Sequence, residues 1–264
     1  MLNKELLEKQ RDIESRTNKN CLLKRVMEEF SKEDLGDIKP EIKKNITYIL
    51  AQVFLHKRLL PEALIALCAK RMELQDASNL IEELVENEWI GWNGIQLITA
   101  LDLSDDVKKE LDLYQFPLPM LIQPRRLNKN NDTGYWFCKK GSIILKDNYH
   151  EDDVCLDVIN KANAISLKLN AKTCVMVHNQ WRNMDKKKAS ETDEEYKNRI
   201  HQFDNFNERA TQIQEWLINE GNTFYLTNKV DKRGRIYSQG YFINSQGTDY
   251  QKACIEFKHG EFLN

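Results

Sequence analysis

Apolar residues recur at helical spacing through the first part of the chain. Within residues 46–54 and 80–85 they return every three or four positions, as on one face of an α-helix. Pro61 suits the first turn of a helix, where its missing N–H costs no hydrogen bond. Ser31 followed by Asp34 has the pattern of a capped helix start. We therefore predict about five or six short helices in this part.

The pattern changes at residues 116–124, where three prolines exclude a helix. A stretch rich in Asn and Asp follows, and residues 142–145 have the composition of a strand. This composition predicts an extended, loop-rich platform with one or two strands.

Helical spacing returns at residues 153–169, and residues 173–177 fit either a short strand or a continuing helix. Thr192 and Glu195 form the pattern of a capping box, which predicts a helix start. Helical spacing then continues to Glu220, before a glycine. The fold class predicted from these elements is α+β, predominantly α-helical.

Composition narrows the functional classes. The 39 basic and 41 acidic residues give a net charge of −2, which excludes a uniformly basic coat but not local basic patches. The amino-terminal residues lack a secretory signal pattern, and the longest apolar stretch, residues 46–55, is too short to span a bilayer. We therefore expect a cytoplasmic protein with no membrane partner. The six cysteines and five histidines lack the spacing of a zinc site, so no metal site is predicted.

The strongest candidate for chemistry is the basic segment 229–235, which carries four cations against Asp231. Guanidinium groups match phosphate oxygens, and Gly234 between two arginines allows close approach of a bulky ligand. Tyr237 offers a ring or a hydroxyl, and Asp231 would orient an arginine or cap a turn. The alternative is an ordinary surface turn. Lys186–Lys188 has the same two interpretations, a solvated turn or a phosphate contact.

The order of motifs then indicates a family. The pattern D-x-R-G-R-x-Y at 231–237, followed by N-x-Q-G-x-D-x-x-K at 244–252, resembles the loop that opens the palm of single-subunit phage and mitochondrial RNA polymerases. The upstream proline-rich stretch, Arg125, Gly134-Tyr135-Trp136 and the helical residues 154–165 are similar to that family in the same order. The resemblance covers roughly residues 115–260.

The resemblance implies an organisation and a set of site residues. It implies a helical amino-terminal region (1–112), a platform (113–183), a minimal thumb (184–223) and the first strands of a palm (224–264). Residues expected to contact template or RNA–DNA hybrid, or to shape that loop, are Asp231, Lys232, Arg233, Gly234, Arg235, Tyr237, Gln246, Gly247 and Lys252. Weaker phosphate contacts are expected at Arg125, Arg126 and Arg209.

The sequence departs from the family where catalysis resides. The two palm aspartates and the fingers helix come later in the family than residue 252, so we expect no catalytic residue here and Mg²⁺ bound by another chain. The resemblance thus implies the small subunit of a two-chain phage RNA polymerase, in the cytoplasm of an infected bacterium, with DNA template, RNA transcript and a second subunit as partners. Before Phe116 we expect no Asn-Gly or Asp-Gly turn between alternating strands, the kind of turn that a strand-separating hairpin would use.

Two other interpretations remain open. One is a free-standing nucleic-acid-binding or scaffold protein derived from a polymerase fragment, and the other is a piece of a longer polymerase. Apolar residues after position 224 are expected to complete a core belonging largely to the second subunit. Alternatively, they form the core of a self-contained domain.

Overall fold

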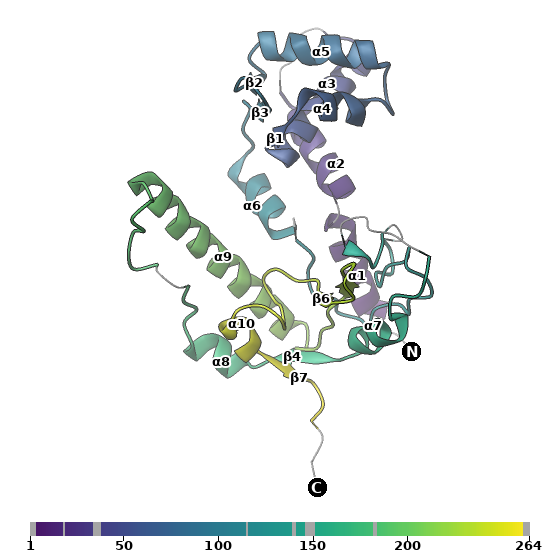
Figure 1. Cartoon of the computed structure of the whole chain (residues 1–264), viewed down its shortest axis with the longest axis vertical. Helices are drawn as coiled ribbons and strands as arrows, with labels where there is room; N and C mark the ends of the chain where they lie inside the picture. Colours follow the sequence, from purple (N-terminus) through teal and green to yellow (C-terminus); the bar gives the residue numbers. More distant parts are fainter. Residues whose placement is uncertain are drawn as a thin grey trace. The chain divides into compact units, whose positions relative to one another are not determined.

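The computed structural model confirms the predicted α+β class with a predominance of helix (Figure 1). It describes residues 4–17, 19–33, 38–114, 116–138, 141–145, 151–181 and 184–260. The chain divides into two compact units. The smaller unit comprises residues 18–115, and the larger unit comprises residues 1–17 and 116–264.

The smaller unit is built around one buried helix. Its elements are α2 (Lys19–Phe30), α3 (Pro40–His56), β1 (Arg58–Leu59), α4 (Pro61–Cys68), α5 (Leu74–Glu86), β2 (Ile90–Trp92), β3 (Leu97–Thr99) and α6 (Asp105–Tyr114). Residues 46–53 of α3 are all buried, so the middle of this helix is covered on every side. Pro61 occupies the first turn of α4, as predicted.

Two predictions for this unit were wrong. The strands pair antiparallel in the order β1-β3-β2, and Asn93-Gly94 joins β2 and β3 in a hairpin before Phe116. Gly94 has a φ of +92°, and Asn93 Oδ1 accepts hydrogen bonds from the backbone N–H groups of Ile95 (3.1 Å) and Gln96 (2.7 Å), so the Asn93 side chain holds the connection between the two strands. Ser31 lies just after α2 rather than at a described helix start, and Asp34, the other residue of that predicted cap, lies outside the described residues.

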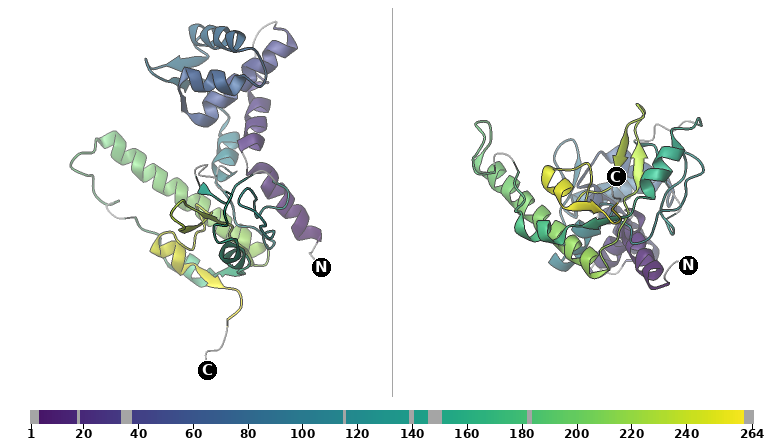
Figure 2. Two further views of the ribbon diagram at one scale, coloured as in Figure 1. Left: turned by 45° about the vertical axis from the view of Figure 1, so that its right-hand side comes forward. Right: turned by 90° about the horizontal axis from the view of Figure 1, so that it is seen from below.

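The larger unit combines helices with paired short strands (Figure 2). Its elements are α1 (Lys4–Arg16), α7 (Leu156–Asn163), β4 (Leu167–Leu169), α8 (Ala171–Met176), α9 (Asp193–Asn219), β5 (Asn228–Val230), β6 (Ile236–Ser238), α10 (Asp249–Ala253) and β7 (Ile255–Phe257). Strand β4 pairs antiparallel with β7, and β5 pairs antiparallel with β6. The helix predicted over 153–169 is therefore too long, because its last part is β4, whereas 173–177 lies mainly in helix α8.

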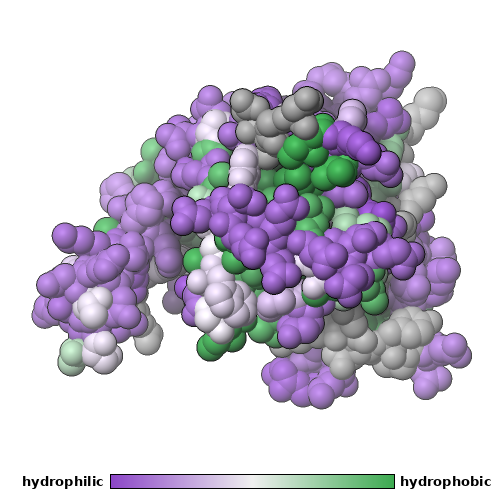
Figure 3. Space-filling model, turned by 90° about the horizontal axis from the view of Figure 1, so that it is seen from above, coloured by the Kyte–Doolittle hydropathy of each residue, from purple (hydrophilic) through white to green (hydrophobic). Residues whose placement is uncertain are grey.

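The platform between residues 116 and 145 is extended, as predicted, but contains bridges rather than full strands. Met120 pairs with Tyr225, and Ile144 pairs with Val230. These bridges tie the platform to β5 and to the segment that leads into it. In the residues that the structure describes, no helix is long and apolar enough to cross a lipid bilayer. The face in Figure 3 is largely covered by polar side chains, with apolar ones gathered in smaller areas.

Glu14 on α1 anchors the platform. Its carboxylate is 3% exposed and accepts hydrogen bonds from the backbone N–H groups of Trp136 (3.0 Å), Phe137 (2.6 Å) and Cys138 (2.9 Å). Gln10, one turn earlier, donates to the same carboxylate and accepts from the N–H of Leu121. One helical face therefore satisfies four backbone donors of a segment more than 100 residues away in sequence.

Helix α9 begins as predicted. The Thr192 hydroxyl accepts from the N–H of Glu195 and the Glu195 carboxylate accepts from the N–H of Thr192, which completes the capping box. The buried residues of α9 lie between Phe206 and Leu217, in its carboxyl-terminal half. Phe206 contacts the rings of Trp181, Tyr241 and Phe242, so this half of the helix packs against the segment after β6.

The amino-terminal half of α9 holds residues 184–192 through one bidentate ion pair. Arg199 Nε and Nη2 each lie 2.7 Å from an oxygen of Glu191, and Nη2 also donates to the carbonyl of Lys186. Tyr196 donates its hydroxyl proton to the carbonyl of Met184. The hydrogen bond from Arg199, together with the N–H of Lys188, lowers the pKa of Glu191 to about 2.

We expect this contact to be lost on acidification. A carboxyl group whose pKa is lower in the folded state stabilises that state above its ordinary value of 4.5, and the stabilisation disappears as the pH falls toward 2. Amide hydrogen exchange at residues 184–199 should therefore accelerate between pH 4.5 and 2, relative to the intrinsic rate. Glu191→Gln should show fast exchange throughout this range. If exchange in Glu191→Gln showed the same pH dependence as in the wild type, Glu191 would not be the group that holds residues 184–199.

Candidate nucleic-acid interface

The basic segment folds into a hairpin with a tight turn at its tip. Strands β5 and β6 pair in the register Asn228↔Ser238, Lys229↔Tyr237 and Val230↔Ile236. Residues 231–235, here called the arginine turn, close with hydrogen bonds from the N–H of Asp231 to the carbonyl of Arg235 and from the N–H of Gly234 to the carbonyl of Asp231, each 2.9 Å. Gly234 has a φ of +80°, a conformation that other residues adopt only with strain.

Asp231 organises this turn from within. Its side chain is 14% exposed, and one carboxylate oxygen accepts from the backbone N–H groups of Arg233 (2.9 Å) and Arg235 (3.0 Å). The other oxygen accepts from the guanidinium groups of both arginines at 3.0–3.1 Å and from the Tyr237 hydroxyl at 3.3 Å. A single carboxylate thus orients two guanidinium groups and a phenol.

The electrostatics keep the aspartate charged. Partial burial raises the pKa of Asp231, but the hydrogen bonds and positive charge of Arg235 outweigh it, so the net pKa lies below its usual value. The bond to Asp231 correspondingly raises the pKa of Arg235. Both partners stay ionised across the physiological range, so the arrangement does not depend on pH there.

The arginines remain available to a ligand. The side chains of Arg233 and Arg235 are 63% and 52% exposed, although each binds Asp231 through one edge. A guanidinium has five N–H donors, so its other edge can bind a phosphate in a fixed orientation. Lys232 is also exposed at the tip. The turn is therefore a preorganised anion-binding surface with an excess of positive charge.

The platform supports the base of the hairpin. Val230 is fully buried against Leu127, Ile143, Ile144 and Ile159, and its N–H donates to the carbonyl of Ile143 at 2.8 Å. This cluster joins the platform, α7 and both hairpin strands in one core, which limits how far the arginine turn can move.

Asn163 is a support that the motif analysis did not identify. It is 3% exposed on α7, and its Oδ1 accepts from the backbone N–H of Asn228 (2.8 Å) and from the Asn228 side chain (3.0 Å). It therefore fixes the first residue of β5. Nothing in the helical spacing around Asn163 distinguishes it, because its partner lies 65 residues later.

The second half of the motif also reaches the hairpin. Gln246 Oε1 accepts from the N–H of Ser238 (2.8 Å), and Gln246 Nε2 donates to the carbonyl of Ile236 (3.0 Å), so its amide pairs with β6 as another strand would. Gly247 lies against Gln251, where an added Cβ would fall 1.9 Å from the Gln251 side-chain oxygen. Lys252 on α10 is exposed and lies 3.4 Å from Asp249.

The three weaker candidates lie elsewhere. The guanidinium of Arg125 turns into the platform, where it binds Asp132 (2.8 Å) and the carbonyls of Thr133 and Tyr135. Arg126 is exposed. Arg209 lies along α9 with a largely buried side chain bonded to Gln212 (3.1 Å). The phosphate-binding roles of these arginines stay predictions, and the geometry of Arg125 is that of a structural residue.

Among the described residues from position 224 onward, several large apolar side chains are covered by this chain itself, although Tyr241 is exposed. Phe224, Leu226, Phe242 and Ile243 are at most 4% exposed, whereas Phe257 is 66% exposed. The larger unit therefore has its own core in this region. In the part of the chain that the structure describes, no group of three or more His, Cys, Asp or Glu side chains is arranged to hold a metal ion.

Comparison with known proteins gives an independent indication. The chain is 27% identical over 164 residues to a probable DNA-directed RNA polymerase of Agaricus bitorquis, covering 53% of this chain and 15% of that protein. It is 27% identical over 177 residues to a probable DNA-directed RNA polymerase of Gelasinospora sp. (strain G114), covering 60% of this chain and 20% of that protein. No protein-family model matches the chain. The chain thus spans a fifth or less of these relatives, and the similarity supports a relationship to DNA-directed RNA polymerases, the transcription enzymes that transfer nucleotides.

Proposed function

We propose that this chain is a subunit of a phage DNA-directed RNA polymerase that holds template and transcript while a second chain performs nucleotide transfer. The observation that carries the proposal is the arginine turn, in which Asp231 presents Arg233 and Arg235 outward on a rigidly supported hairpin. Phosphates along an RNA–DNA hybrid are the ligands that such a surface fits. The similarity to RNA polymerases gives this ligand class its context.

The remaining elements take roles in the same proposal. Helix α9, with residues 184–192 held along it, would act as a short thumb beside the hybrid. The second chain would supply the catalytic aspartates and the fingers and hold the Mg²⁺ ions that activate the attacking hydroxyl and stabilise the leaving phosphates. The proposed site of action is the cytoplasm of an infected bacterium.

The test uses Arg233→Gln/Arg235→Gln in the polymerase assembled with its second chain. Each charge-assisted hydrogen bond to phosphate contributes about 1.5–3 kcal/mol, so the variant should bind a hybrid scaffold at least roughly tenfold more weakly. A plot of log affinity against log salt concentration should also become less steep, with the magnitude of its slope reduced by roughly 1.4–1.8, the value for two lost contacts. Lys4→Gln/Lys172→Gln removes two exposed charges from the same unit and should leave both quantities unchanged.

A second candidate is a free-standing nucleic-acid-binding protein, because the hydrogen bonds that shape the arginine turn are made between residues of this chain. Purification of the tagged chain from infected cells distinguishes the polymerase subunit from the free-standing protein. Stoichiometric recovery with a chain carrying palm and fingers motifs, and RNA synthesis by the pair alone, supports the subunit. Recovery without such a chain, with DNA binding retained, supports the alternative.

A further inference from the structure

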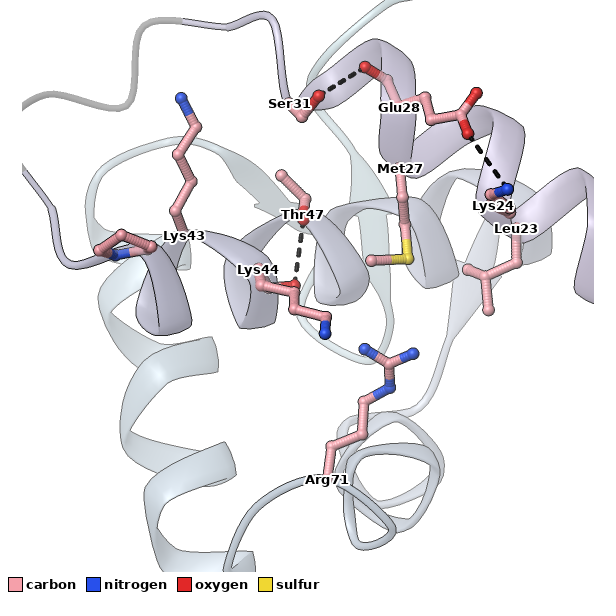
Figure 4. Close-up of a pocket in the computed structure, with 10 residues that line it drawn as sticks. Leu23, Lys24, Met27, Glu28, Ser31, Lys43, Lys44, Thr47 and Arg71 are labelled. Carbon is pink, nitrogen blue, oxygen red and sulfur yellow. Dashed lines mark hydrogen bonds and ion pairs between the residues drawn. The ribbon is translucent and has the colours of Figure 1, made fainter.

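The smaller unit contains a pocket that the proposed function does not use (Figure 4). It lies between α2, the first half of α3 and the turn after α4, and has a volume of about 490 Å³, within the ~300–1,000 Å³ typical of ligand sites. Its cationic lining residues are Lys24, Lys43, Lys44 and Arg71. Leu23 and Met27 supply an apolar wall.

The positive charge of this pocket is local. Residues 18–115 contain 13 basic and 18 acidic residues, a formal charge of −5. The pocket nevertheless gathers four of those cations and one acid, Glu28. A net acidic unit with four cations in one hollow attracts an anion, or one segment of a polyanion, at that place rather than over its whole surface.

Two of the cations converge. In Figure 4 the Lys44 ammonium and the Arg71 guanidinium extend into the same space, below Met27, whereas Lys43 points away and donates to the carbonyl of Glu33. The Arg71 guanidinium lies over the ring of Tyr48, 4.0 Å from its centre, which restricts its orientation. Among the described residues no acidic side chain lies within ion-pair distance of Lys44 or Arg71, and both are exposed.

We propose that this pocket binds the phosphodiester backbone of a nucleic-acid strand, with one phosphate between Lys44 and Arg71. A guanidinium binds two phosphate oxygens through one edge, and an ammonium adds a point charge beside it. The apolar wall of Leu23 and Met27 suits the sugar that follows the phosphate. The choice of nucleic acid over other phosphate compounds rests on the proposed function. The smaller unit thereby makes a second contact, independent of the arginine turn.

The experiment measures fluorescence anisotropy of labelled 20-nucleotide single-stranded DNA, the matching DNA duplex and RNA of the same sequence. In a background of Arg233→Gln/Arg235→Gln, the added pair Lys44→Gln/Arg71→Gln should weaken binding of at least one probe roughly tenfold and lower its salt slope by about 1.4–1.8. The control pair Arg58→Gln/Lys109→Gln removes the same charges from exposed positions of the same unit and should change neither quantity. An equal loss of probe affinity in the two double variants would overturn the proposal.

A second variant, which is expected to strengthen binding, distinguishes a lost contact from a misfolded protein. Glu28→Gln removes the one acid among the described residues that line the pocket and should tighten binding of the same probe about two- to threefold, which an unfolded variant cannot do. Unchanged or weaker binding by this variant overturns the proposal. Competition by poly-glutamate as effective as by the oligonucleotide would also overturn it, in favour of an acidic peptide ligand. Because the arginine turn is already disabled in this background, failure here leaves the proposed function untouched.

Discussion

Asp231→Ala is expected to weaken hybrid binding roughly tenfold, the scale of one lost charge-assisted hydrogen bond, although the variant gains positive charge. Charge alone predicts the opposite, because removing an acid from a cationic turn should strengthen its attraction for phosphate. Geometry predicts the loss. Asp231 holds both guanidinium groups and two backbone N–H groups, so without it the arginines lose their common orientation.

The measurement is the affinity for an RNA–DNA hybrid, compared at equal ionic strength. Asp157→Ala removes an exposed acid of the same unit and should leave affinity unchanged or slightly increased. Asp231→Asn keeps a side-chain oxygen for the backbone N–H groups and should fall between the wild type and Asp231→Ala. Tighter binding by Asp231→Ala would show that the aspartate only offsets charge and does not orient the arginines.

Glu14→Ala is expected to lower the free energy of unfolding by about 3 kcal/mol, because it leaves three backbone N–H groups of the platform without an acceptor. At roughly 2–4 °C per kcal/mol, the melting temperature of the larger unit should fall by roughly 6–12 °C. The effect is large because the carboxylate is buried and its partners cannot all turn to water.

The measurement is thermal unfolding followed by circular dichroism and calorimetry. Glu8→Ala is the matched control, because it makes the same substitution at an exposed position of the same helix and should stay within about 0.5 kcal/mol of the wild type. Hydrogen exchange should also become faster at residues 136–138 in Glu14→Ala alone. Equal melting temperatures in the two variants would show that α1 is not the anchor of the platform.

Features encoded in adjacent residues were predictable from the sequence. The capping box at Thr192, proline at the start of α4 and the turn at Gly234 each depend on side chains within a few positions of one another. Their local hydrogen bonds and steric preferences do not require knowledge of the rest of the fold. The motif around Asp231 also identified the residues that now form the arginine turn.

Features that depend on distant partners were not predictable. Strand β4 has only three residues, and Leu169 continues the helical spacing of the residues before it, so the conformation of β4 depends on its pairing with β7 and on the bridge from Leu167 to Phe224. The buried role of Glu14 depends on residues 122 or more positions away. The hairpin at Asn93-Gly94 was missed because its strands are too short to show alternation over several residues.

Gln246 has a consequence for how other chains can approach the hairpin. The outer edge of a two-stranded ribbon normally offers unpaired backbone groups that recruit foreign strands and promote aggregation. Here one amide occupies the carbonyl of Ile236 and the N–H of Ser238, and so closes that edge without adding a strand. Another molecule must then approach the hairpin at the arginine turn, whose charge favours soluble polyanions over sheet-forming polypeptides.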